Sequence, residues 1–85
     1  MGKGIIRLNG EDNVVIALAD LAAGAHPEGV DGALIQAVPR GHKISVRPIR
    51  KGELVIRYGQ IIGQATEDIP AFAHVHSHNL GMGPH

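Results

Sequence analysis

The sequence that decides the fold of this 85-residue chain is the stretch Leu54-Val55-Ile56-Arg57-Tyr58-Gly59-Gln60-Ile61-Ile62-Gly63-Gln64-Ala65. It holds two short runs rich in aliphatic and β-branched residues, 54–58 and 60–65, which meet at Gly59. Such residues favour strands, and a glycine at the junction lets the backbone reverse direction. We therefore expect two strands joined as a hairpin.

Further strands are expected upstream of this hairpin. Residues 4–8 are followed by Asn9-Gly10, a pair that supports a tight hairpin turn, and residues 13–18 return as a second strand. The apolar run in that second strand is continuous, which is typical of a strand buried on both sides. Residues 30–38 and 43–47 are also expected as strands, the latter with clear alternation of polar and apolar residues.

Glycine and proline set the overall architecture. Gly24 and Pro27 limit residues 19–25 to a helical turn at most. With 12 glycines, 5 prolines and about seven short strands, the chain is expected to form one compact all-β domain over residues 1–85. Because so small a core is only marginally stable, we also expect an oligomer or a partner subunit.

Composition excludes several classes of function. Eight Lys and Arg residues balance eight Asp and Glu, and only two aromatic residues are present, so a nucleic-acid-binding protein is not expected. The absence of cysteine excludes disulfides, thiolate metal sites and a cysteine nucleophile. Apolar runs are too short to span a membrane and no apolar export region is seen at the start, so we expect a soluble, cytoplasmic protein.

Chemistry is expected in residues 73–80, which hold three of the six histidines. If this segment is extended, His74, His76 and His78 share one face of a strand. Three imidazoles in a row suit a divalent transition metal and leave a position for substrate. The alternative is a solvated terminal strand, because histidine-rich ends of chains are often poorly ordered.

Three other residues are candidates for binding substrate. Asn79 offers an amide beside the histidines, and His42 and Lys43 lie where a loop enters the expected strand 43–47. A lysine there would bind a carboxylate as a point charge, although a solvated strand entry explains it equally well. Carboxylates near the histidines, at Glu67 and Asp68, are more typical of a solvated turn.

Several motifs, taken in order, resemble the N-terminal domain of the altronate and galactarate dehydratase family. These are Gly41-His42-Lys43-Ile44, the stretch 52–65, Asp68-Ile69 and His74-Val75-His76-Ser77-His78-Asn79-Leu80. The resemblance covers nearly the whole chain and implies a β-clip fold of the SAF type. The chain departs from the family at Ala71-Phe72-Ala73, where a glycine-containing turn is usual. Phe72 either fills the core or faces a partner, and a core position is the commoner outcome because an exposed Phe is disfavoured without an interface.

The resemblance also implies a function. Members of the family remove water from sugar acids such as altronate or galactarate, so the chain is expected to be the small subunit of a hydro-lyase that acts with a large catalytic subunit. A related pair of subunits releases sulfite from sulfolactate. A non-catalytic SAF module that binds carbohydrate or protein is a third alternative.

These expectations combine into a mechanism. A divalent cation held by His74, His76 and His78, with Fe(II) or Mn(II) favoured over zinc, would stabilise the charge that develops when an α proton is removed. His76 and His78 are also expected to take part in catalysis, because imidazoles titrate near neutral pH and can protonate a leaving hydroxyl.

Overall fold

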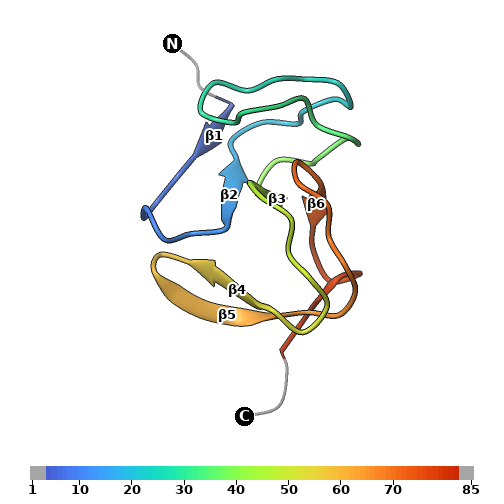
Figure 1. Ribbon diagram of the computed structural model, residues 1–85. Helices are drawn as coiled ribbons and strands as arrows, with labels where there is room; N and C mark the ends of the chain where they lie inside the picture. The colour runs from blue at the N-terminus through green and yellow to red at the C-terminus, as the bar shows by residue number, and fades with distance from the viewer. Residues whose placement is uncertain (1–3, 83–85) are drawn as a thin grey trace.

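The computed structural model describes residues 4–82, which form short β-strands and contain no helix (Figure 1). The strands are β1 (Ile5–Ile6), β2 (Val14–Ala17), β3 (Lys43–Ser45), β4 (Leu54–Arg57), β5 (Gln60–Ala65), β6 (His74–Val75) and β7 (Leu80–Gly81). The predicted all-β class and number of strands are confirmed. Within residues 4–82, accordingly, no helix has the length and apolar character needed to cross a membrane.

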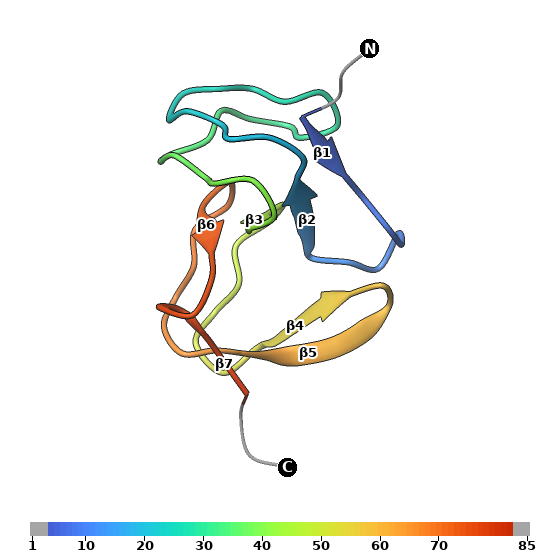
Figure 2. The same ribbon diagram turned by 180° about the vertical axis from the view of Figure 1, so that it is seen from behind.

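The strands form two antiparallel sheets. One has the order β1-β2-β3-β6 and the other the order β4-β5-β7. Figures 1 and 2 show the four-stranded sheet above the hairpin of β4 and β5. The histidine segment therefore begins in one sheet, at β6, and ends in the other, at β7.

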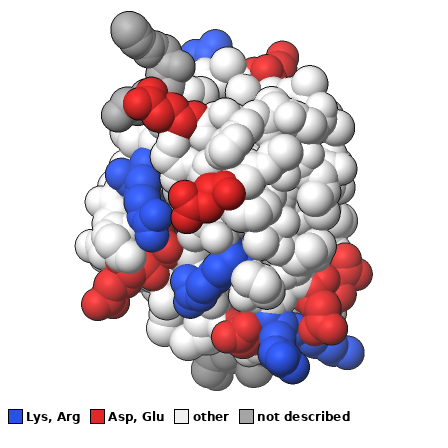
Figure 3. Space-filling model, turned by 45° about the horizontal axis from the view of Figure 1, so that its top comes forward, with Lys and Arg blue, Asp and Glu red and all other residues white. Residues whose placement is uncertain are grey.

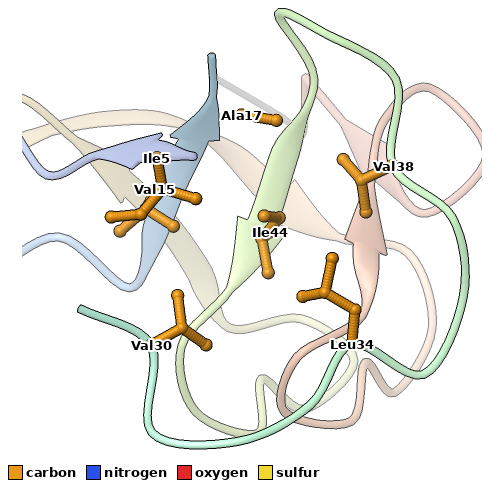
Figure 4. Packing of buried hydrophobic residues seen from close by; sticks show 7 residues of the cluster. All are labelled: Ile5, Val15, Ala17, Val30, Leu34, Val38 and Ile44. Atoms are coloured by element: carbon orange, nitrogen blue, oxygen red, sulfur yellow. The ribbon is translucent and has the colours of Figure 1, made fainter. Parts of the chain in front are cut away.

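Strand β2 of the four-stranded sheet is buried on both faces. Val14 and Val15 are neighbours in β2 and point to opposite sides, yet both are almost inaccessible to solvent. Val15 packs with Ile44 and with residues of the long loop before β3, such as Leu34, in the cluster that Figure 4 shows. Val14 packs instead with Val55 and residues of the three-stranded sheet. This arrangement confirms burial on both sides for β2, whereas Leu18 at the end of the predicted run is 47% exposed.

The hairpin predicted from residues 54–65 is present. Strands β4 and β5 are joined by Tyr58 and Gly59, whose φ angles are 63° and 69°. Two consecutive positive φ angles are typical of the tight turn whose twist matches that of the strands. The register shifts between Val55 and Ile56, so that β5 carries one extra residue there.

The first hairpin is wider than the Asn9-Gly10 pair predicted. The turn exists, since Asp12 N–H donates to the Asn9 carbonyl at 3.1 Å, but β1 pairs with β2 only from Ile6 back to Ile5. Asp12 and Asn13 are buried, and their side chains bond to the β4–β5 hairpin instead. These bonds draw the loop toward the second sheet and end its pairing with β1.

The strand predicted for residues 30–38 is wrong. Only Val38 pairs, in an isolated bridge with Leu21. The buried residues of the segment are Val30, Leu34 and Val38, four apart, which is not the period of two that a strand requires. The segment instead crosses the sheet as a loop and inserts these three side chains into the core. The predicted strands 13–18 and 43–47 are also shorter in the structure, as β2 and β3.

Phe72 lies in the turn that leads to β6. Its φ of 65° lies in the left-handed region that glycine usually fills, which costs an L-residue on the order of 1 to 2 kcal/mol. The ring packs on Gly32 so closely that a Cβ at that glycine would lie 2.4 Å from Phe72 Cε2. Phe72 is therefore half-buried against the core, as predicted, and its position fixes the approach of the chain to β6.

Candidate functional site

Two paired strands bring together three histidines from distant parts of the sequence. His42 lies directly before β3, and His74 begins β6. In the antiparallel pairing, Ile44 stands opposite His74 and Lys43 opposite Val75. The same register, continued by one residue, sets His42 opposite His76, and alternation places all three imidazoles on one face.

The three imidazoles lie against one another. His42 Nδ1 is 2.8 Å from His74 Nε2, a hydrogen-bond distance. The rings of His42 and His76 are stacked, with centroids 3.8 Å apart and planes inclined by 13°. One ring nitrogen from each of the three residues lies within 4.8 Å of the others. We call His42, His74 and His76 the histidine cluster.

Two members of the cluster, His74 and His76, have lowered pKa values. Burial, followed by the charges of neighbouring histidines, lowers the pKa of His74 below its usual 6.5. Burial, followed by the charges of His42 and Lys43, lowers the pKa of His76 in the same direction. A neutral imidazole offers a lone pair to a metal ion, whereas an imidazolium does not. His74 and His76 are therefore shifted toward the neutral form, which can bind a cation.

The strand that sequence reasoning expected to carry three histidines ends after Val75. Residues 76–79 form a turn, so His78 does not continue the row of His74 and His76. The His78 ring lies 5.0 Å from that of His74 and is tilted by 35°, outside the group of nitrogens that could share one ion. The expectation of one extended face was wrong, because the turn redirects the chain toward β7.

Asn79 closes this turn from inside the protein. Its side chain is 4% exposed, its Oδ1 accepts from His76 N–H at 3.0 Å, and its Nδ2 donates to the His74 carbonyl at 2.9 Å. Both ends of the amide are thus engaged with the backbone of the histidine segment. The contact with substrate predicted for Asn79 stays a prediction, and the structure gives this residue a structural task.

Lys43 is half-buried in β3 beside the cluster. Alternation starts its side chain on the opposite face of the strand from His42. Burial, and then the charge of Arg57, lowers the pKa of its ammonium group. The Nε of Arg57 is buried and has no hydrogen-bond partner. Positive charge therefore gathers on this side of the sheets.

The histidine cluster has the donor set of a transition-metal site. Three imidazole nitrogens close together, two of them with lowered pKa, match the ligands that zinc, iron and related divalent ions take in proteins. Three protein ligands leave further positions for substrate. The residues present therefore fit a divalent cation, although they do not select one metal over another.

Sequence reasoning placed His42 with substrate and not with the other ligands. His42 and His74 are separated by 32 residues and meet only because β3 pairs with β6. One feature of the sequence could have indicated this role. His42 lies directly before a predicted strand, as a further histidine close to the end of that strand. The register that joins the two strands cannot be read from either segment alone.

The surface around the fold carries both signs of charge. On the face that Figure 3 shows, Lys and Arg side chains lie among Asp and Glu side chains, next to a broad uncharged area. This face therefore presents no patch of a single sign.

Together, the fold and the cluster define a small all-β domain with three imidazoles at the edge of one sheet. Comparison with protein families identifies the family of this domain. Residues 3–83 match the altronate/galactarate dehydratase SAF domain. The chain belongs to this family. The resemblance inferred from the sequence motifs is confirmed.

Individual relatives agree with the family. The chain is 48% identical over 77 residues to altronate dehydratase of Escherichia coli, and 37% identical over 79 residues to altronate dehydratase of Bacillus subtilis. It is also 41% identical over 44 residues to the (2R)-sulfolactate sulfo-lyase subunit alpha of Chromohalobacter salexigens, which covers 52% of this chain and 47% of that subunit.

The dehydratases are much longer than this chain. The matches cover 87% and 91% of the chain but only 15% and 16% of the two altronate dehydratases. The chain thus corresponds to one segment of enzymes that carry most of their length elsewhere. The similarity to both large dehydratases and a sulfo-lyase subunit indicates a multidomain or multisubunit setting.

Proposed function

We propose that this chain is the small subunit of a cytoplasmic sugar-acid dehydratase, which removes water from a polyhydroxy carboxylic acid together with a large catalytic chain. Support comes from the family match and from the altronate and galactarate dehydratases among its relatives. The observation that carries the proposal is the histidine cluster, because a module that only binds another protein has no need of three adjoining imidazoles.

In this proposal His42, His74 and His76 hold a divalent cation, with Fe(II) or Mn(II) favoured. Such ions accept oxygen ligands readily, and a sugar acid offers a carboxylate and hydroxyl groups. When bound, the ion supplies positive charge that stabilises the negative charge developing as the α proton leaves. This set replaces His78 of the sequence-based hypothesis with His42.

The remaining residues act on the substrate. His78 stands beside His74 but outside the group of nitrogens that could share an ion, which leaves its imidazole for proton transfer to the departing hydroxyl. Lys43 contributes a positive charge whose effect reaches His76, so it attracts the carboxylate of the substrate. His76 is assigned to the ion and not to proton transfer, because one lone pair cannot serve both.

A second candidate is the small subunit of a sulfolactate sulfo-lyase. The specific observation is the similarity to subunit alpha from two organisms, a protein that is itself named as a subunit. Sulfolactate is also an α-hydroxy acid with a leaving group on the next carbon. The same cluster would serve both reactions, so the choice between them lies with the large chain.

A chimaeric enzyme tests the proposal. In altronate dehydratase of E. coli, the 77-residue matching segment is replaced by this chain, and water loss from altronate is measured after loading with Fe(II) or Mn(II). We expect activity with the unchanged chain and its loss with His42→Ala or His74→Ala, whereas Ile35→Ala, at an exposed loop residue, keeps it. Full activity in a folded chimaera carrying both histidine substitutions would overturn the assignment. Sulfite release from sulfolactate, assayed with the corresponding sulfo-lyase partner, would favour the second candidate.

A further inference from the structure

The side-chain amide of Asn79 takes the place of a neighbouring strand. It bonds to the His74 carbonyl on one side of Val75 and to the His76 N–H on the other. The same two backbone groups would bond to an adjacent strand if β6 had a partner on that side. Because both bonds come from one rigid planar group, they fix the backbone from His74 to His76.

The backbone of Asn79 is anchored as well. Its N–H donates to the His76 carbonyl at 3.0 Å, and its carbonyl accepts from Thr66 N–H at 3.0 Å, next to the end of β5. All four polar groups of the residue are therefore in use. The amide is held by the second sheet and in turn holds the segment that carries two of the three clustered imidazoles.

The chain contains a matched case without histidines. The Asn13 amide donates to the Leu54 carbonyl at 2.9 Å and accepts from Ile56 N–H at 2.8 Å, on the two sides of Val55. Val55 and Val75 are both fully buried in the same core cluster. Asn13 thus stabilises a strand without holding any histidine. Comparing Asn13 with Asn79 therefore distinguishes an effect on stability from an effect on the position of a metal ligand.

We propose that Asn79 is the positioning residue of the histidine cluster, which sets His74 and His76 at the separation needed to bind a divalent cation with His42. This inference rests on the metal site proposed above. The clamp acts through the backbone: it orders the segment before the ion arrives, so that binding does not have to fix it. Without the clamp, the turn that follows Val75 is free to change the direction of the His76 side chain.

The test uses the full 85-residue chain with Mn²⁺ and with Co²⁺, whose visible absorption reports the ligands around the ion. Calorimetric titration gives the affinity, and thermal unfolding gives the stability. The variants are Asn79→Ala, which removes both bonds, Asn79→Ser, whose short neutral hydroxyl can still accept from His76 N–H, and Asn13→Ala as the matched control.

We expect Asn79→Ala to bind Mn²⁺ about 10- to 100-fold more weakly, as is usual when a group that orients metal ligands is removed. Asn79→Ser should lose less, and Asn13→Ala should stay within about twofold of the unchanged chain, since distant sites act independently. The Co²⁺ spectrum should change for the Asn79 variants and not for Asn13→Ala.

Three outcomes would count against the proposal. If a folded Asn79→Ala binds Mn²⁺ like the unchanged chain, the positioning role is wrong while the metal site stands. If Asn13→Ala weakens binding as much as Asn79→Ala does, the effect is general stability. If the unchanged chain binds neither ion, the metal site of the proposed function fails as well. Should Asn79→Ala not fold, Asn79→Ser decides between the first two outcomes.

Discussion

Two buried asparagines, Asn13 and Asn79, hold two segments of this protein by the same pair of bonds. Each amide joins a carbonyl and an N–H on the two sides of a buried valine. The segments differ in what flanks the valine. Around Val55 these are Leu54 and Ile56, aliphatic residues of a sheet, whereas around Val75 they are two histidines.

The same pair of amide hydrogen bonds has different consequences around the two valines, because different residues flank them. In both places the amide satisfies backbone groups that would otherwise be buried without partners. Around Val55 this yields stability and the contact between the sheets. Around Val75 it yields the same stability and also fixes two imidazoles against a third, so that a folding device becomes part of a candidate binding site.

The largest effect is expected between β5, which pairs with the Val55 segment, and β7, which follows Asn79. A Cβ at Gly63 in β5 would lie 2.3 Å from the Gly81 carbonyl oxygen and 2.9 Å from Leu80 Cδ1 in β7. Because the backbone must move to relieve this contact, we expect Gly63→Ala to lower the free energy of unfolding by about 3 kcal/mol. Chemical denaturation measures it, and Gly10→Ala, with open space around the new methyl, is the control. Equal stability of the two variants would show that β5 and β7 do not approach each other as described.

A smaller effect is expected from removing either amide. Asn13→Ala leaves the Leu54 carbonyl and the Ile56 N–H without partners, and Asn79→Ala does the same on the two sides of Val75. Each should cost about 2 kcal/mol of unfolding free energy, since leaving buried polar groups unsatisfied carries a penalty of that order. Denaturation of both variants under one condition makes the comparison. A negligible cost for Asn13→Ala would mean that water replaces the amide there.

Metal binding separates the histidine set of the structure from that of the sequence. His42→Ala removes a member of the cluster and should weaken Mn²⁺ binding at least about tenfold. His78→Ala removes an imidazole outside it and should change the affinity much less. Titration calorimetry on both variants decides the matter. A greater loss for His78→Ala would restore the row of His74, His76 and His78 as the ligands.

The local sequence pattern correctly predicted elements whose contacts are mostly with residues close in the sequence. The β4–β5 hairpin followed from β-branched runs around Gly59, and the burial of β2 on both faces followed from its unbroken apolar run. The strand predicted for residues 30–38 was wrong, because tertiary contacts determine the conformation of this segment. Val30, Leu34 and Val38 are buried in the core at a spacing of four residues, which no strand has.

The sequence predicted that histidines would gather, but it did not predict which of them lie together. Histidines two residues apart suggested a ligand set, which stays a prediction, and the rings of His74 and His76 do lie near each other. His42 joined them through the register of β3 with β6, and His78 left because the amide of Asn79 turns the chain after Val75. Both facts depend on contacts made across the fold, which a single segment does not encode.

The smallest expected effect is the response of stability to pH, and it distinguishes the two clamped regions. Near the Asn79 clamp, His74 and His76 have lowered pKa values, so the unfolded chain takes up protons before the folded chain does. Their contribution to stability is complete above pH 6.5 and is lost as the pH falls from 6.5 through the lowered values. Near the Asn13 clamp, burial opposes ionisation of Asp12, but backbone hydrogen bonds, among them one from Gly59 N–H, outweigh it and lower its pKa below 3.8. Its contribution is present above pH 3.8 and is lost only below that value.

Denaturation at a series of pH values should therefore show two separate declines, one for each region. His74→Gln should reduce the decline that begins at pH 6.5 and leave the acid decline unchanged, whereas Asp12→Asn should do the reverse. The histidine decline comes first as the pH falls, because the folded chain disfavours the imidazolium form of His74 and His76. The acid decline follows, because the folded chain disfavours the neutral carboxyl form of Asp12. A stability that is flat between pH 6.5 and 4 would mean that His74 and His76 keep their ordinary pKa, and the argument from pKa values for a cation at this site would then be lost.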